Sequence, residues 1–130
     1  MKTRMPILIG IALCLVLSAC GTSSTSGGAA AAVEDYLNAL VEKDADALST
    51  LSCADWESSA LMEMDSFEAV TPRLDAVSCS ETGSDDSGTS VTCSGKIITT
   101  YDNEDSELDL SRWTYNVVQE NSNWLVCGYK

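Results

Sequence analysis

The chain contains no histidine, the side chain that most often acts as a general base near neutral pH. The Ser-His-Asp arrangement of hydrolases is therefore excluded. The sequence also lacks a glycine-rich phosphate loop, and none of its cysteines are spaced as Cys-x-x-Cys, the usual zinc-binding pattern. These absences favour a binding or structural protein over an enzyme, and we expect neither a cofactor nor a metal site.

Basic residues are scarce, with 7 Lys and Arg against 20 Asp and Glu and a net charge of −13. A surface this acidic is repelled by the phosphates of nucleic acids and by anionic lipid headgroups. Nucleic acid is therefore not expected among the partners. The charge serves either solubility outside the cell, which is the simpler interpretation, or a specific basic partner.

The longest apolar run lies near the N-terminus. It extends over residues 7–17, is interrupted only by Gly10, and follows Lys2 and Arg4. In a helix these residues would span about 16 Å, roughly half of the hydrocarbon thickness of a bilayer. A basic start, a short apolar segment and small residues at its end predict a secretory signal peptide over residues 1–19, not a permanent membrane span.

The end of this segment, Leu17-Ser18-Ala19-Cys20, resembles the lipobox of bacterial lipoproteins. In that family the cysteine thiol receives a diacylglyceryl group, and the peptide bond before the cysteine is then cut. The resemblance implies that Cys20 carries the acyl chains (palmitate among them). It also places the protein in the cell envelope, anchored to a membrane on the extracytoplasmic side. One acyl chain anchors only marginally, whereas two or three on one residue hold firmly.

Residues 21–28 are exclusively Gly, Ser and Thr, a composition that behaves as a flexible coil with an end-to-end distance of about 16 Å. We expect residues 20–28 to be a tether and residues 29–130 to form a single domain. Removing residues 1–19 deletes two basic residues and no acidic one, so 5 basic and 20 acidic side chains remain and the net charge becomes −15.

Four cysteines remain once Cys14 has left with the signal peptide and Cys20 has been lipidated. An even number of cysteines in a small exported domain predicts disulfides. The four are Cys53, Cys79, Cys93 and Cys127.

The first half of the domain has helical periodicity. Residues 29–43 place one apolar face at Val33, Tyr36, Leu37 and Leu40. Asp44 is expected to cap a short second helix, and Asp55 a third that ends before Thr71-Pro72. The apolar face of the third helix would consist of Trp56, Ala60, Met64 and Phe67.

The second half has the pattern of antiparallel strands, expected at residues 73–81, 89–101, 108–120 and 123–129. Short connections between successive strands predict a meander, with the helices covering one face of the sheet. The acidic segment 102–109 offers oxygen ligands for calcium but lacks the glycine and the spacing of an EF-hand loop. We expect it to form a solvated hairpin tip.

The strand register predicts the cysteine pairing. A hairpin centred on Asp86 places Cys79 opposite Cys93, since each lies seven residues from the centre. Cys127 would lie two strands from Cys93, a separation of about 10 Å that no disulfide can span. Cys53, at the end of the second helix, is then left to pair with Cys127.

The segments "VEDYLNALVEKDADALSTLSC" and "NWLVCGY" resemble small bacterial lipoproteins of the nuclear transport factor 2-like superfamily. The resemblance implies a cone, in which three N-terminal helices are wrapped by a curved antiparallel sheet. We therefore expect an α+β fold with N-terminal helices packed on a curved antiparallel sheet of about four strands. The superfamily includes ketosteroid isomerases, dehydratases and members that only bind, so the fold does not decide the function.

A pocket between helices and sheet would be lined by apolar and aromatic residues of both layers. The candidates are Tyr36, Leu40, Trp56 and Met64 from the helices and Trp113 or Tyr115 from the sheet. The same residues would be ordinary core if the cone were filled. The ketosteroid isomerase pattern, an aspartate base with a tyrosine beside a buried acid, cannot be mapped onto this sequence residue by residue.

The favoured hypothesis is a lipid-anchored envelope lipoprotein whose domain binds a small molecule or an envelope protein without catalysis. One alternative is a small-molecule isomerase or lyase that uses the cone pocket. The other is a structural subunit of an envelope assembly. An inward-facing carboxylate with a raised pKa would favour the enzyme, and a contiguous exposed apolar patch would favour the assembly subunit.

Overall fold

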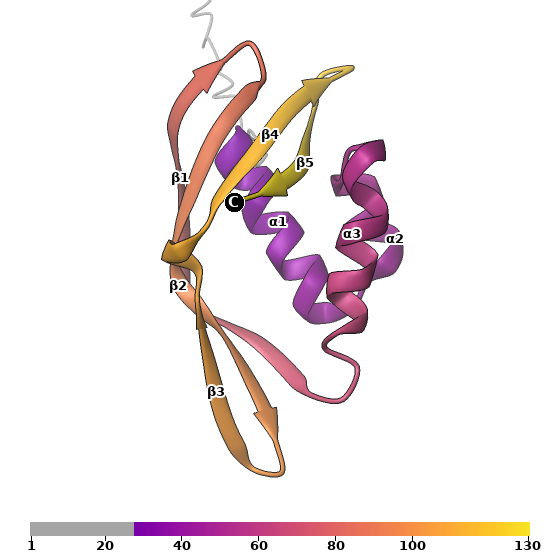
Figure 1. Ribbon diagram of the computed structural model, residues 1–130, viewed down its shortest axis with the longest axis vertical. Helices are drawn as coiled ribbons and strands as arrows, with labels where there is room; N and C mark the ends of the chain where they lie inside the picture. The colour runs from indigo at the N-terminus through magenta and orange to yellow at the C-terminus, as the bar shows by residue number, and fades with distance from the viewer. Residues whose placement is uncertain (1–27) are drawn as a thin grey trace, which may run out of the picture.

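The computed structural model describes residues 28–130, and the expected signal peptide, Cys20 and nearly all of the expected tether lie outside this range. Three helices precede the sheet and lie on one side of it (Figure 1). The elements are α1 (Ala29–Glu42), α2 (Ala45–Leu51), α3 (Ala54–Asp65), β1 (Thr71–Asp85), β2 (Gly88–Tyr101), β3 (Glu104–Asp109), η1 (Leu110–Arg112), β4 (Thr114–Glu120) and β5 (Asn123–Tyr129). The α+β fold is confirmed, in the arrangement that the resemblance implies.

Helix α1 forms the centre of the core. The four positions of its predicted face are all fully buried: Val33, Tyr36, Leu37 and Leu40. The helix ends at Glu42, and the positive φ of 57° at the next residue, Lys43, turns the chain toward α2. The Asp44 side chain then accepts a hydrogen bond of 3.0 Å from the Ala47 backbone N–H, as predicted for the N-cap of α2.

Helix α3 begins differently from the prediction. Its N-cap is Cys53, and Asp55 lies in the first turn. The Cys53 N–H donates to the Val126 carbonyl at 3.0 Å, and the Cys53 carbonyl accepts from Trp56 and Glu57. The start of the helix is therefore set by pairing with β5, a tertiary contact that capping preferences do not report.

The sheet is antiparallel, with the strand order β1-β2-β4-β5, and β3 also pairs with β2. The single strand expected at 108–120 is wrong, because η1 interrupts it. The Asp109 side chain accepts from the Ser111 N–H at 2.9 Å, and Leu110 at the break is fully buried. As a result β3 pairs with the C-terminal half of β2 and β4 with its N-terminal half, which gives five strands in place of about four.

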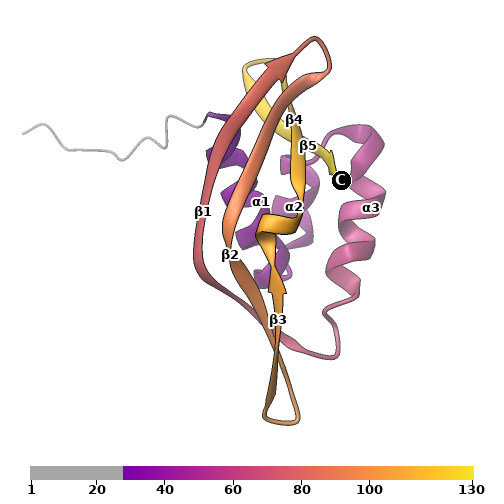
Figure 2. The ribbon, with the colours of Figure 1, turned by 60° about the vertical axis from the view of Figure 1, so that its left-hand side comes forward.

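The acidic segment is also only partly the expected hairpin tip. Its turn is Asp102-Asn103, both with positive φ, and Glu104–Asp109 is strand β3. The β2–β3 hairpin extends beyond the helices in Figure 2. The paired strand has replaced most of the expected loop, because β2 is long enough to provide it with a partner along its whole length.

In the β1–β2 hairpin Cys79 lies opposite Cys93 because two one-residue shifts of the strand register cancel each other. The turn closes with Asp85 opposite Gly88, whereas a centre at Asp86 would place Asp85 opposite Ser87, so the register at the turn differs from the predicted one by one residue. An irregularity between Glu81 and Gly83 then shifts the register back by one residue. A bulge of this kind adds one residue to one strand only, and so restores the alternation at the cysteines.

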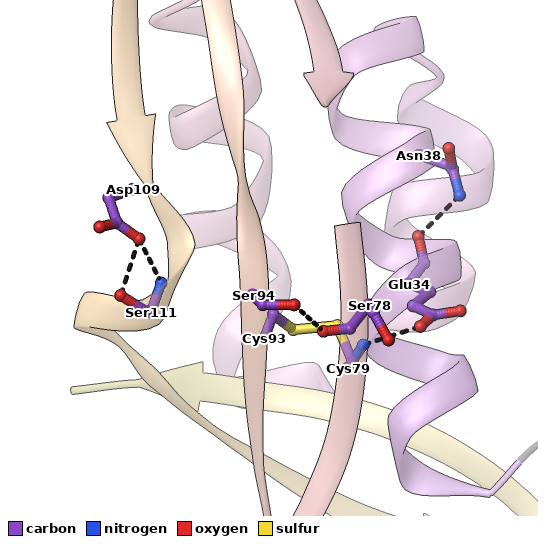
Figure 3. Close-up of a disulfide and its surroundings, with 8 residues drawn as sticks. All are labelled: Glu34, Asn38, Ser78, Cys79, Cys93, Ser94, Asp109 and Ser111. Atoms are coloured by element: carbon purple, nitrogen blue, oxygen red, sulfur yellow. Dashed lines mark hydrogen bonds between the residues drawn. A yellow bond between two sulfur atoms is a disulfide. The ribbon is translucent and has the colours of Figure 1, made fainter. Parts of the chain in front are cut away.

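The structure contains the two disulfides that the register predicts, Cys79–Cys93 and Cys53–Cys127. Figure 3 shows the first, between β1 and β2, beside α1. There the Glu34 carboxylate of α1 accepts a hydrogen bond of 2.8 Å from the Cys79 N–H. The second disulfide connects the start of α3 to β5.

We predict unequal losses of stability when the disulfides are removed one at a time. In the chain-entropy model a bridge across 14 residues contributes about 3 kcal/mol and a bridge across 74 about 4.5 kcal/mol. The pair Cys53→Ala/Cys127→Ala should therefore lower the free energy of unfolding, measured in urea, more than the pair Cys79→Ala/Cys93→Ala. A Cys53–Cys79 peptide in a non-reducing digest would contradict the pairing itself.

Candidate functional site

The six residues expected to line a pocket are mostly core. Tyr36, Leu40 and Tyr115 are at most 2% exposed, and Trp56, Met64 and Trp113 pack around them partly buried. The rings of Tyr36 and Tyr115 meet edge to face, with centroids 6.5 Å apart. These side chains thus pack together between the helices and the sheet, and two of them, Trp56 and Tyr115, also line a cavity.

One carboxylate enters this interior. Glu63 of α3 accepts hydrogen bonds from the Tyr36 hydroxyl at 3.1 Å and from the Tyr129 hydroxyl at 3.2 Å, one on each carboxylate oxygen. The Trp56 indole N–H donates to the Tyr36 hydroxyl oxygen at 3.1 Å. The cluster therefore joins α1, α3 and β5 through polar groups that are all paired.

Sequence reasoning missed Glu63 and Tyr129. A signal for Glu63 was present, because it lies seven residues after Trp56 and three after Ala60 on the apolar face of α3. A carboxylate within an apolar helical stripe needs a partner that satisfies it. Its partners come from α1 and β5, and no local pattern reports that pairing.

Burial sets the protonation of this cluster. It raises the pKa of Glu63 above its ordinary value, although the hydrogen bonds from Tyr36 and Tyr129 act in the opposite direction. Burial and the nearby Glu63 charge raise the pKa of Tyr129 to about 12 and raise the pKa of Tyr36 as well. The two phenols thus remain protonated donors at any physiological pH.

A cavity of about 320 Å³ opens beside these rings. Trp56, Tyr115 and Tyr129 line it, but Glu63 does not. The Tyr129 ring lies 5.5 Å from Trp56, and Gly128 adopts a positive φ of 126° where a side chain would approach Trp56 to 3.3 Å. The polar side of the cavity comes from Asp85, Ser87, Ser90, Thr114, Asn116 and Lys130.

Two carboxylates of the acidic segment 102–109 form ion pairs with basic side chains. Asp105 pairs with Arg73 at 3.0 Å, and Glu107 pairs with Lys96 at 2.6 Å. Between residues 28 and 130, no group of three or more Asp, Glu, Cys or His side chains is arranged to hold a metal ion. Over the same range, no helix has the length and apolar character that crossing a membrane requires.

Comparisons with known proteins give the fold and little more. No protein-family model and no curated protein matches the chain. It is similar to a solved SEC-C motif containing protein from Rhodopseudomonas palustris, with 13% identity, a TM-score of 0.52, and coverage of 79% of this chain and 80% of that one. It is also similar to a substituted variant of a protein named Rd1NTF2_05, with 13% identity, a TM-score of 0.48, and coverage of 75% and 90%. At a TM-score below 0.5 we draw nothing from the second likeness. The likeness to the SEC-C motif containing protein, at 13% identity, shows the fold alone.

The raised pKa of Glu63 predicts a specific pH dependence of stability. An acid whose pKa is higher in the folded than in the unfolded state favours folding most when protonated, so its contribution declines as pH rises through the folded pKa. Glu63→Gln resembles the protonated acid at every pH. The stability of this variant relative to the unmodified chain should therefore increase as the pH is raised from 4.5 to 7.5.

Urea unfolding of both proteins at the two pH values measures this difference. Glu68→Gln, on an exposed carboxylate, is the matched control and should show no such change. A stability difference between Glu63→Gln and the unmodified chain that does not vary with pH would contradict the assignment.

Proposed function

We propose that this protein is a lipid-anchored lipoprotein of the cell envelope whose domain binds a partner or ligand without catalysing a reaction. The proposal that the domain does not catalyse a reaction is supported mainly by the hydrogen bonding and position of Glu63. Both of its oxygens accept hydrogen bonds from tyrosines, and it does not line the neighbouring cavity. A general base must reach the proton that it removes, and these contacts occupy the carboxylate.

The anchor is supported by the sequence Leu17-Ser18-Ala19-Cys20 and by the basic and apolar segment before it. The two disulfides of the domain fit an oxidising compartment outside the cytoplasm. Together they favour attachment through lipid on Cys20, with the domain held on the extracytoplasmic side of the membrane.

Substituting Cys20 tests the anchor. We expect Cys20→Ser to be absent from the washed membrane fraction, or to retain its signal peptide, because the serine hydroxyl does not receive the diacylglyceryl group in the lipoprotein family. Metabolic labelling with an alkyne fatty acid measures the attachment directly. Equal labelling of Cys20→Ser and the unmodified protein would show that the lipid is elsewhere or absent.

The enzyme alternative retains one supporting observation, the inward-facing Glu63 with its raised pKa. An isomerase or lyase would need Glu63 to exchange a tyrosine partner for a substrate. The assembly alternative has less support. Within residues 28–130 the large hydrophobic side chains that are strongly exposed are Met62 and Tyr101, which are too few for a contiguous patch of several hundred Å².

A binding protein should retain its ligand or partner when purified gently. We expect native mass spectrometry of the full chain, isolated in mild detergent from its own host, to show a reproducible added mass that disappears on denaturation. The bound species should be recovered chemically unchanged after incubation. Its conversion to a product by the unmodified protein, and not by Glu63→Gln, would favour the enzyme.

A further inference from the structure

The exposed side of α1 and α2 forms a groove of about 510 Å³, to which α1 contributes Asp35, Asn38, Ala39 and Glu42. Its floor includes Ala39, Ala47 and Leu51. Two of these side chains are alanine methyl groups, which leave the space between the two helices open. The groove shares no residue with the cavity lined by Trp56, Tyr115 and Tyr129, here called the aromatic cavity, and is therefore separate from it.

The rim of the groove is acidic. Asp35 and Glu42 of α1 and Asp46 of α2 line it, and no basic residue does. Lys43, which follows α1, instead donates to the Val70 carbonyl at 3.0 Å. Neither of the ion pairs formed within residues 28–130 involves the three rim carboxylates.

The groove continues toward the turn between β4 and β5. A second cavity of about 190 Å³ shares Asp35 and Leu51 with it and adds Ala32 and Trp124. The combined surface therefore has an apolar floor, from Ala47 to Trp124, beside a rim that carries three acidic side chains together with Asn38 and Thr50. This combination of apolar floor and acidic rim is the complement of an amphipathic segment that carries basic residues.

The spacing of the acids favours a helix as the occupant. Asp35 and Glu42 lie seven residues apart on one helix, which places them on the same face about 10 Å apart. Basic residues seven apart on a second helix have the same spacing. Apolar residues between them, at the third and fourth positions, would then lie over Ala39 and Leu51.

Charge excludes the other simple occupants. A second copy of the chain would bring another 20 acidic side chains against 5 basic ones, if residues 1–19 are removed. Anionic lipid and nucleic acid are repelled for the same reason. We propose that the groove between α1 and α2 binds a basic amphipathic helix of a partner protein. This rests on the proposed function of the domain as a binding module.

A defined peptide tests this proposal on the full chain in a mild non-ionic detergent. The probe is a capped 15-residue helical peptide with lysines seven residues apart and leucines at the third and fourth positions between them. A scrambled peptide of the same composition is its control. Fluorescence anisotropy of the labelled peptides measures the dissociation constants, and a photoreactive side chain on the probe identifies the residues that it contacts.

Two triple variants separate the groove from general electrostatics. Asp35→Asn/Glu42→Gln/Asp46→Asn removes the rim charges, and Asp65→Asn/Glu68→Gln/Asp102→Asn removes three exposed charges elsewhere. Partly exposed ion pairs contribute modestly, so we expect the rim variant to weaken binding by about tenfold and the control variant by less than about threefold. The crosslinks should fall within residues 32–51 and 122–124.

Equal losses in the two variants, or equal binding of the scrambled peptide, would overturn the proposal in favour of non-specific attraction. No binding at millimolar protein would overturn it as well, while a retained ligand in native mass spectrometry would still support the proposed function. Crosslinks to Trp56 or Tyr129 would show a binding domain whose site is the aromatic cavity and not the groove.

Discussion

The fold depends on the burial of one face of α1 against the curved sheet. Tyr36, Leu37 and Leu40 are completely buried there, and burying side chains of this kind contributes about 1.5–3 kcal/mol each. The helix contacts α2, α3 and the strands β1, β2, β4 and β5. Within residues 28–130, α2 and α3 contact the sheet mainly through β5, so α1 and the curvature of the sheet around it close most of the core (Figures 1 and 2).

Polar contacts at the two edges of the sheet hold it in this position. At the β1 edge, Glu34 accepts from the Cys79 N–H and Glu81 accepts from the Ala29 N–H at 3.1 Å, so helix and strand each satisfy a donor of the other. Such contacts also occupy part of an edge that would otherwise be free to pair with another chain. At the β5 edge, Cys53 bonds to Val126 through the backbone and to Cys127 through sulfur.

The sequence predicted the structure correctly where a pattern of a few neighbouring residues determines it. The buried face of α1 and the capping of α2 by Asp44 were both predictable, because each follows from spacing within a few residues. The break at Leu110–Arg112 was not recognised, because apolar residues alternate on both sides of it and the Asp109–Ser111 contact that forms it is weak evidence in a sequence. Glu63 was missed for a different reason: its partners are 27 and 66 residues away.

The close packing of the aromatic side chains between the helices and the sheet has a consequence for which positions can change in sequence. In a cone with an open pocket, specificity and stability depend on the same side chains, so a change in one affects the other. Here Tyr36 and Tyr115 pack against each other in the core, while Asp35, Glu42 and Asp46 lie exposed on the outer side of the same helical layer. Adjacent positions on an α-helix point about 100° apart. Asp35 is exposed whereas Tyr36 is fully buried, so Asp35 can change with little effect on the packing of Tyr36. The outer surface of the helices can therefore change in sequence while the core stays constant.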